Sequence, residues 1–113
     1  MKQIGENITL EQQGSTTIIR ISNNLGYDTA DDLRNAYQEV KTSNILVDLG
    51  QVTITTSRGM ATLLSIIVEG QEEQQMFCLC NVSDACMLII DAMNIMDYIE
   101  GLEILDTIED GLA

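Results

Sequence analysis

Apolar and polar residues alternate with a period of two near the start of the chain, which is the spacing of a β-strand. In NITLEQQ, the apolar residues Ile8 and Leu10 alternate with polar neighbours, and Gly14-Ser15 precedes a second, β-branched run, TTIIRIS. Two such runs on either side of a glycine-containing turn indicate a β-hairpin. The sequence therefore predicts that the chain opens with a hairpin over residues 7–22.

The period then changes from strand-like to helical in NNLGYDTADDLRNAYQEVK. The apolar residues with helical spacing are Ala30, Leu33, Ala36, Tyr37 and Val40. Thr29 and Asp32 have the spacing of a capping box, which predicts that this helix starts near Thr29. The carboxylates of Asp28, Asp31 and Asp32 suit the positive end of a helix dipole, so a catalytic role is not needed to explain them.

A second strand and helix follow without any proline between them. NILVDL has the length and apolar content of a strand that is buried on both faces. The stretch VTITTSRGMATLL then passes from β-branched residues to helix formers, which predicts a helix over residues 57–69. Its apolar side would carry Met60, Leu63, Leu64, Ile67 and Val68, and Gly70 with the polar EGQEEQQ would end it.

The last third of the chain repeats the alternation of strand and helix. MFCLCNV predicts a strand, and Ser83 can cap a third helix through CMLIIDAM, whose apolar residues on all sides indicate deep burial. LEIL predicts a last short strand, and Thr107 with Asp110 repeats the capping pattern before a terminal helical turn. The stripe of Met87, Met93 and Met96 is either core or an exposed contact surface.

Strands that alternate with helices of this length predict a mostly parallel sheet, here with an antiparallel first hairpin. The expected fold is an α/β sandwich with a mixed, mostly parallel sheet of four to five strands. The chain is too short to cover both faces of such a sheet well, so we expect the helices mainly on one face.

Length and composition narrow the class of protein. The 113 residues suffice for one domain, 45% of them are hydrophobic, and no stretch has the length of apolar residues that a membrane-spanning helix needs. The start, MKQIGENITL, lacks the apolar core of a signal peptide. We expect a single domain over residues 1–113, located in the cytoplasm.

The charge balance is strongly acidic, with 18 Asp and Glu against 5 Lys and Arg and a formal net charge of −13. Nucleic acids and anionic membrane surfaces are poor partners for such a chain, because binding them requires basic residues. A protein partner with a basic surface is favoured instead. The alternative is a solvated acidic surface that only keeps the protein soluble.

The three cysteines, Cys78, Cys80 and Cys86, do not form a disulfide pattern, and the chain has no histidine. Cys78 and Cys80 alternate along a predicted strand, so both point to one face. A thiol pair or half a metal site is conceivable, but buried reduced thiols are favoured. We therefore expect no cofactor and no metal, and an enzyme that uses Cys78 and Cys80 for thiol exchange is the weakest hypothesis.

The run ILVDL, followed by VTI, a serine, a glycine and an apolar helix, resembles the STAS domain of bacterial anti-sigma factor antagonists. That family shows the pattern L-D-L-x-x-V-x-F-I/M, then D-S-S-G, then L-G/A-x-L-L. The matching positions are Asp48, Leu49, Val52, Ile54, Gly59, Met60, Ala61, Leu63 and Leu64. TADDLRNAYQEV, CLCNVSDACMLII and TIEDGLA also resemble segments of the family, so the resemblance covers nearly the whole chain and implies a STAS-like fold.

The resemblance implies a regulatory binding module and not an enzyme. STAS domains of this kind bind an anti-sigma factor, which is a serine kinase of histidine-kinase-like fold. A phosphatase is a second candidate partner. Phosphorylation of a corner serine releases the kinase, since a phosphate adds charge that a tight interface without counter-charge does not tolerate. A monomer or weak dimer without membrane insertion is expected.

The chain departs from the family where the phosphate is normally added. Residues 56–61, which we call the corner, begin Thr56-Ser57-Arg58-Gly59 in place of Asp-Ser-Ser-Gly, so Arg58 takes the position of the family's phosphoacceptor. Either Arg58 fixes the domain in a permanently unphosphorylated state or pairs with a carboxylate of a partner, or Ser57 or Thr56 has become the acceptor. Without a functional role, Ser57 is an N-cap and Arg58 a solvated surface residue.

The resemblance places partner binding at the corner. The expected contact residues are Thr56, Ser57, Arg58, Gly59, Met60 and Ala61, with Ser57 as the candidate phosphorylation site. The alternative function is a small cytosolic STAS subunit of an ABC-type lipid or anion transporter, in which the same corner would dock on an ATPase.

Overall fold

The strands and helices of the computed structural model, which describes residues 1–112, follow the predicted alternation and add two short elements. The elements are β1 Lys2–Ile4, β2 Ile8–Gln13, β3 Thr16–Leu25, α1 Tyr27–Gln38, β4 Asn44–Thr55, α2 Ser57–Glu72, β5 Met76–Cys80, α3 Asp84–Ala92, α4 Ile95–Tyr98, β6 Glu103–Leu105 and α5 Ile108–Leu112. The predicted series lacks β1 and α4. Each spans at most four residues, which is too short to show a period.

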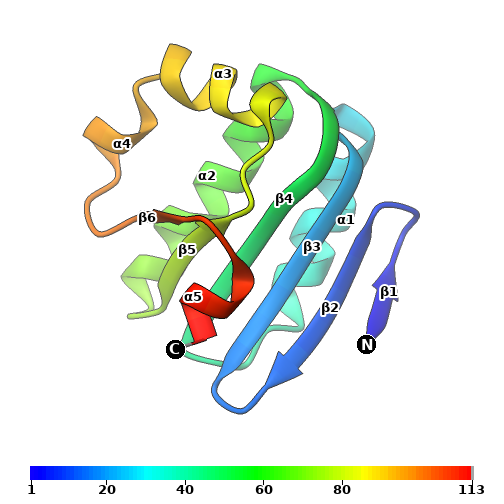
Figure 1. Ribbon diagram of the computed structural model, residues 1–113. Coiled ribbons are helices and arrows are strands. Elements are labelled where there is room, and N and C mark those ends of the chain that lie inside the picture. Colours follow the sequence, from blue (N-terminus) through cyan, green and yellow to red (C-terminus); the bar gives the residue numbers. More distant parts are fainter. Residues whose placement is uncertain (113) are drawn as a thin grey trace.

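All the strands form one sheet in the order β1-β2-β3-β4-β5-β6 (Figure 1). β1, β2 and β3 pair antiparallel, so the predicted hairpin is confirmed as β2 and β3. β3 through β6 pair parallel. The mixed, mostly parallel sheet is therefore confirmed, but it has six strands and not four to five.

The two faces of the sheet are covered unequally, as expected. α1 and α2 lie behind the sheet in Figure 1, and their buried residues, including Leu33 and Leu63, join the larger of two hydrophobic clusters. Only the short α5 lies in front, where Ile108 packs on a small cluster with Leu46 and Cys80. Most of the buried hydrophobic residues belong to this larger cluster, so most of the core lies on the face that α1 and α2 cover.

The start of α1 differs from the prediction. The helix begins at Tyr27 with Gly26 as its N-cap, and no side chain caps it. Thr29 lies inside the first turn, where it is buried and its hydroxyl donates to the backbone carbonyl of Asn24 at 2.6 Å. The predicted capping box of Thr29 and Asp32 is therefore wrong, because the helix starts as soon as β3 ends.

Two other predictions about helices are corrected. α2 continues through Gly70, which is buried so close to the Phe77 ring that a Cβ there would overlap it. On the same helix, Ile66 takes the core position expected of Val68, whose side chain is exposed. α3 is not buried on all sides, since Leu88 is 71% exposed, although Ser83 caps it as predicted by accepting from the backbone N–H of Cys86.

None of the helices in residues 1–112 has the length and apolar character needed to cross a membrane.

Candidate functional site

The corner stands on a two-stranded ribbon that continues beyond the rest of the sheet. β4 pairs with β5 only as far as Asp48 and Cys80, but with β3 as far as Thr55 and Leu25. The pairing of β3 with β4 shifts register twice in this outer part, as in a β-bulge. The ribbon therefore carries the corner outward, and Ile54 near its end is 60% exposed.

Thr56, and not Ser57, caps α2. The hydroxyl of Thr56 accepts a hydrogen bond from the backbone N–H of Gly59 at 3.1 Å, and its own N–H donates to the carbonyl of Leu25. Ser57 is the first residue of the helix and is exposed. The interpretation of Ser57 as the N-cap is therefore wrong by one residue, which leaves its hydroxyl accessible and without a capping role.

Gly59 and Met60 form the buried base of the corner. Gly59 lies against the backbone of Leu25 and Gly26, and a Cβ at Gly59 would overlap the carbonyl oxygen of Leu25. Met60 is fully buried among core residues. These two residues position the corner, and their burial leaves its exposed side chains to other residues.

The exposed residues of the corner are Thr56, Ser57, Arg58 and Ala61. Arg58 lies over the ring of Tyr27, with its guanidinium carbon 4.5 Å from the ring centre. The two residues meet because α1 and α2 start from adjacent parallel strands, so both helix N-termini emerge at the same edge of the sheet. A hollow of about 180 Å³ lies beside them and is also lined by Asp31, Arg34 and Thr62.

The charge of Arg58 is not matched by an acid in residues 1–112, because no carboxylate lies within ion-pair distance of it. Its position in the first turn of α2 costs about 0.3–1 kcal/mol through the helix dipole. Stacking on Tyr27 returns a similar amount, about 0.5–1 kcal/mol at an exposed site. The ring therefore holds the guanidinium in place while its N–H groups stay free to bind an acceptor.

Sequence reasoning missed two exposed residues of this surface, Tyr27 and Ile54. Tyr27 is 67% exposed and lies at the start of α1, far from Arg58 in the sequence. No local pattern joins them, and only the parallel pairing of β3 with β4 does. Tyr and Arg are among the residue types that carry most of the binding energy in protein interfaces.

The three thiols are poorly suited to nucleophilic chemistry. Cys78 and Cys80 lie on the same face of β5, as predicted, and all three cysteines are free. Burial, with smaller contributions from nearby negative groups, raises the pKa of Cys80 to about 11. Burial also raises the pKa of Cys78 and Cys86, so little thiolate forms at neutral pH. In the described part of the chain, no three acidic or cysteine side chains gather as metal ligands.

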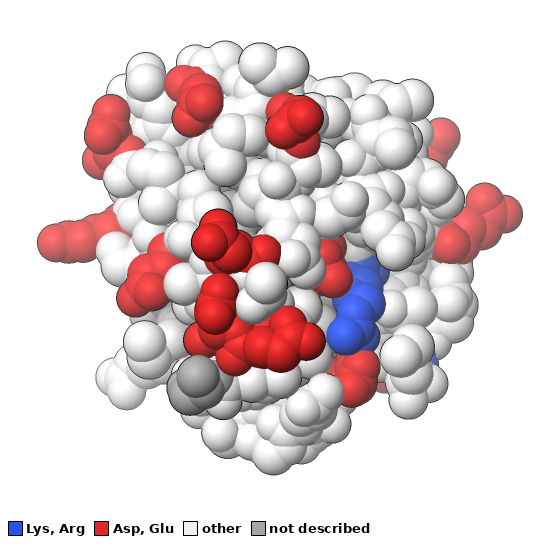
Figure 2. Space-filling view, viewed as in Figure 1, with Lys and Arg blue, Asp and Glu red and all other residues white. Residues whose placement is uncertain are grey.

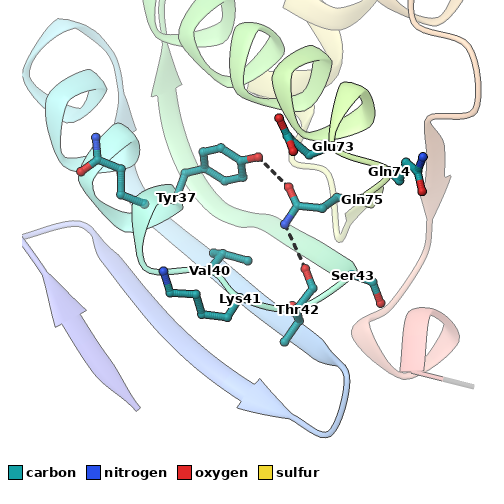
Figure 3. Close-up of a pocket in the computed structure, with 9 residues that line it drawn as sticks. Tyr37, Val40, Lys41, Thr42, Ser43, Glu73, Gln74 and Gln75 are labelled. Carbon is teal, nitrogen blue, oxygen red and sulfur yellow. Dashed lines mark hydrogen bonds between the residues drawn. The ribbon is translucent and has the colours of Figure 1, made fainter.

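A larger hollow, of about 500 Å³, lies at the opposite edge of the sheet, between the C-terminal ends of α1 and α2 (Figure 3). Its polar groups bond to one another. The Tyr37 hydroxyl donates to Gln75 Oε1 at 2.6 Å, and Gln75 Nε2 donates to the carbonyl of Thr42 at 2.9 Å. Burial raises the pKa of Tyr37, with further contributions from Glu69 and Glu73. These hydrogen bonds therefore connect α1 and the segment after it with the segment after α2, and the hollow does not gather reactive groups.

Comparison with known proteins agrees with this architecture. The STAS domain profile matches residues 7–111. The solved structure of the anti-sigma factor antagonist SpoIIAA in its unphosphorylated form is similar over 93% of this chain and 92% of its own, at 16% identity and a TM-score of 0.75. No curated protein matches the chain by sequence.

Two further solved structures have the same fold. An anti-sigma factor antagonist from Mycobacterium paratuberculosis is similar over 93% of this chain and 89% of its own, at 18% identity and a TM-score of 0.78. A sulfate transporter family protein from Wolinella succinogenes is similar over 90% of this chain and 85% of its own, at 16% identity and a TM-score of 0.76.

Proposed function

The chain belongs to the STAS domain family, and from that premise we propose that it is a regulatory binding module of the anti-sigma factor antagonist type. Its partner is a histidine-kinase-like anti-sigma factor or a related regulator in a partner-switching pathway. It performs no catalysis of its own. Similar solved structures include two anti-sigma factor antagonists, which supports this class of function.

The observation that carries the proposal is the exposed surface formed by Arg58, Tyr27 and Ile54 at the end of the β3–β4 ribbon. The buried Gly59 and Met60 hold this surface in one conformation, so little ordering is needed when a partner binds. Arg58 offers a fixed guanidinium that matches a carboxylate in a two-pronged hydrogen bond. The corner therefore suits a partner with an acceptor group at the centre of its own surface.

The proposed function does not include the usual phosphorylation of a corner serine, because Arg58 stands where the family has its phosphoacceptor. A phosphoserine would add about −1.5 to −2 charges to the first turn of α2, whereas the guanidinium keeps one positive charge under all physiological conditions. Binding would then be governed by the concentration of the partner or by a second surface. The identity of that partner determines which cellular process the chain regulates.

A second function, a STAS subunit of a lipid or anion transporter, is supported by the similar fold of the sulfate transporter family protein. In this case the corner docks on a transporter ATPase and not on a kinase. The two candidates require the same exposed corner, so they are separated by the identity of the captured protein.

Affinity capture tests the proposal. The wild-type chain, Arg58→Glu and Lys41→Glu serve as baits in lysate of the organism that encodes the chain, and captured proteins are identified by mass spectrometry. Lys41 is exposed at the opposite edge of the sheet, so Lys41→Glu makes the same charge change away from the corner. We expect a kinase of histidine-kinase-like fold on wild type and Lys41→Glu, and its loss on Arg58→Glu.

A transporter ATPase with the same dependence on Arg58 would support the second function. Capture that is equal for all three baits would overturn the role of the corner in both functions.

A further inference from the structure

A second exposed apolar surface lies on α3 and α4. Leu88 is 71% exposed and Tyr98 is 81% exposed, and Met96 between them in the chain is also exposed. Together with the carboxylates of Asp91 and Asp97, these residues make up what we call the α3–α4 patch. α3 and α4 are neighbours in the fold (Figure 1), and neighbouring elements with large exposed apolar side chains often mark an interaction site.

Buried residues of α3 and α4 fix the position of the patch. Cys86 and Ile90 of α3 and Ile95 of α4 are buried in the main core, which turns Leu88 outward. The two helices are joined through Asn94, whose φ of 52° lies in the left-handed region that asparagine tolerates. The exposed side chains therefore do not belong to a loosely packed segment, and burial in the folded core does not explain them.

A hollow of about 180 Å³ lies at the junction of the two helices. Apolar side chains of Ile90, Ile95 and Met96 line it together with the carboxylates of Asp91 and Asp97. This combination suits the side chain of a lysine or arginine, whose aliphatic stem contacts apolar atoms while its charged end stays at the polar rim. The volume and lining of the hollow therefore indicate a basic residue of a partner.

The charge around the patch has one sign. All five Lys and Arg of the chain lie in residues 1–58, whereas eleven of the eighteen Asp and Glu lie in residues 59–113. Where Figure 1 places α3 and α4, the space-filling view shows red carboxylates separated by white atoms and no blue (Figure 2). The nearest acidic residues along the chain, Asp84 and Glu100, are also exposed.

We propose that the α3–α4 patch docks a basic amphipathic helix of a partner protein. The apolar face of that helix packs on Leu88 and Tyr98, and a lysine or arginine enters the hollow between Asp91 and Asp97. Such helix-in-groove binding combines apolar anchors with complementary charge at the rim. The proposal does not depend on the corner, because its residues come from other elements.

Charge argues against the other occupants. A second copy of this chain would bring Asp91 and Asp97 against acidic residues of the same kind, which costs free energy through like-charge repulsion. An anionic membrane surface would repel the same carboxylates. Only an occupant that is both apolar and basic satisfies the two features of the patch.

The test uses the folded chain, labelled with ¹⁵N, and a synthetic amphipathic helix of leucines and lysines. A peptide of identical composition, scrambled so that it has no apolar face, is the control ligand. We expect the amphipathic peptide to shift amide resonances within residues 84–100, with at least about tenfold tighter binding than the scrambled peptide.

Matched variants distinguish binding at the α3–α4 patch from attraction of the peptide by the overall negative charge. Leu88→Ser with Tyr98→Ser should weaken binding of the amphipathic peptide at least about tenfold, and so should Asp91→Asn with Asp97→Asn. Glu72→Gln with Glu73→Gln removes two charges at exposed positions at the C-terminal end of α2, and Val68→Ser removes an exposed apolar side chain of the same helix. Neither of these controls should change the dissociation constant more than twofold.

Three results would overturn the proposal. The first is equal binding of the amphipathic and scrambled peptides, or equal weakening by the two charge-removing pairs, which would mean that bulk charge alone attracts the peptide. The second is a shift pattern centred outside residues 84–100. The third is concentration-dependent self-association that Leu88→Ser abolishes, which would assign the patch to a second copy of the chain.

Discussion

Arg58 determines which charge the corner presents, because it is the exposed side chain at the position that carries the family's phosphoacceptor. Its guanidinium rests on the ring of Tyr27 and meets no carboxylate within residues 1–112. An arginine in the first turn of a helix is mildly unfavourable for the helix itself. Stacking on Tyr27 offsets that cost, and a contact of Arg58 with a partner is part of the proposed function.

One residue-level prediction concerns phosphate. With the partner kinase and ATP, the wild-type chain should gain no phosphate at the corner, whereas Arg58→Ser should gain it on the new serine. Mass spectrometry of the intact chain and its peptides measures this, with Arg58→Ala as the control that has no hydroxyl at the site. Stoichiometric phosphate on Ser57 of the wild type would contradict a fixed corner, since Ser57 is accessible.

A second residue-level prediction concerns Cys80, whose pKa burial raises from 9.0 to about 11. Above pH 9 the unfolded chain loses this proton, but the folded chain keeps it. The stabilising effect is therefore complete below pH 9 and is lost as pH rises towards 11, by an amount on the order of 2 kcal/mol in the free energy of unfolding.

Urea unfolding at several pH values between 8 and 11 checks the effect of Cys80. The raised pKa values of Cys78, Cys86 and Tyr37 act in the same direction, so the informative comparison is with Cys80→Ala. That variant should show a shallower loss of stability with pH. An identical slope for both proteins would show that Cys80 titrates normally in the folded state.

At the scale of the element, the start of α2 rests on Thr56. Thr56→Ala removes the hydroxyl that accepts from the Gly59 N–H and should lower the free energy of unfolding by about 1 kcal/mol. Ser57→Ala makes a comparable change one residue later and should stay within about 0.5 kcal/mol of the wild type. Denaturant titration of both variants measures the difference, and the reverse order would restore Ser57 as the cap.

The close approach of α2 to the end of β3 leads to another prediction. Alanine normally favours a helix over glycine by about 0.8–1.0 kcal/mol. At Gly59 the new Cβ would overlap the Leu25 carbonyl oxygen, a rigid backbone atom, so Gly59→Ala should instead destabilise the fold by on the order of 3 kcal/mol. A thermal melt with a higher midpoint than the wild type would show that the backbone moves easily here.

The longer elements could be predicted from the sequence because their apolar residues repeat over several turns or pairs. The run NILVDL, the hairpin and the helix after the corner all lie where their patterns place them. β1 and α4 are too short for a pattern. The cap of α2 was misplaced because the neighbours Thr56 and Ser57 are both suited to cap, and that of α1 because the helix begins directly after β3 with Gly26 as its N-cap. Two caps were predicted correctly, Ser83 of α3 and Thr107 of α5.

The candidate site was predicted only in part. Its location at a strand-to-helix corner follows from sequence, since the change from β-branched residues to helix formers is local. The partnership of Tyr27 with Arg58 could not be predicted, because it depends on β3 and β4 being adjacent and parallel. The exposure of Leu88 and Tyr98 could not be predicted either, since apolar composition alone does not tell which face of a short helix is covered.

At the scale of the whole molecule, charge and apolar exposure divide the surface into two regions. The corner carries an exposed arginine on an aromatic ring, whereas the α3–α4 patch carries exposed apolar residues and carboxylates. A STAS domain with two such regions can hold one partner at the corner while a basic helix occupies the patch. Regulation without phosphate at the corner could then act through this second region.

The dissociation constant for the captured partner, measured by isothermal titration calorimetry, tests the central claim that the corner binds through Arg58. Arg58→Glu should weaken binding at least about tenfold with an unchanged thermal midpoint, whereas Lys41→Glu should leave the dissociation constant within twofold of the wild type. Equal affinity of wild type and Arg58→Glu, or equal weakening by both variants, would contradict the account.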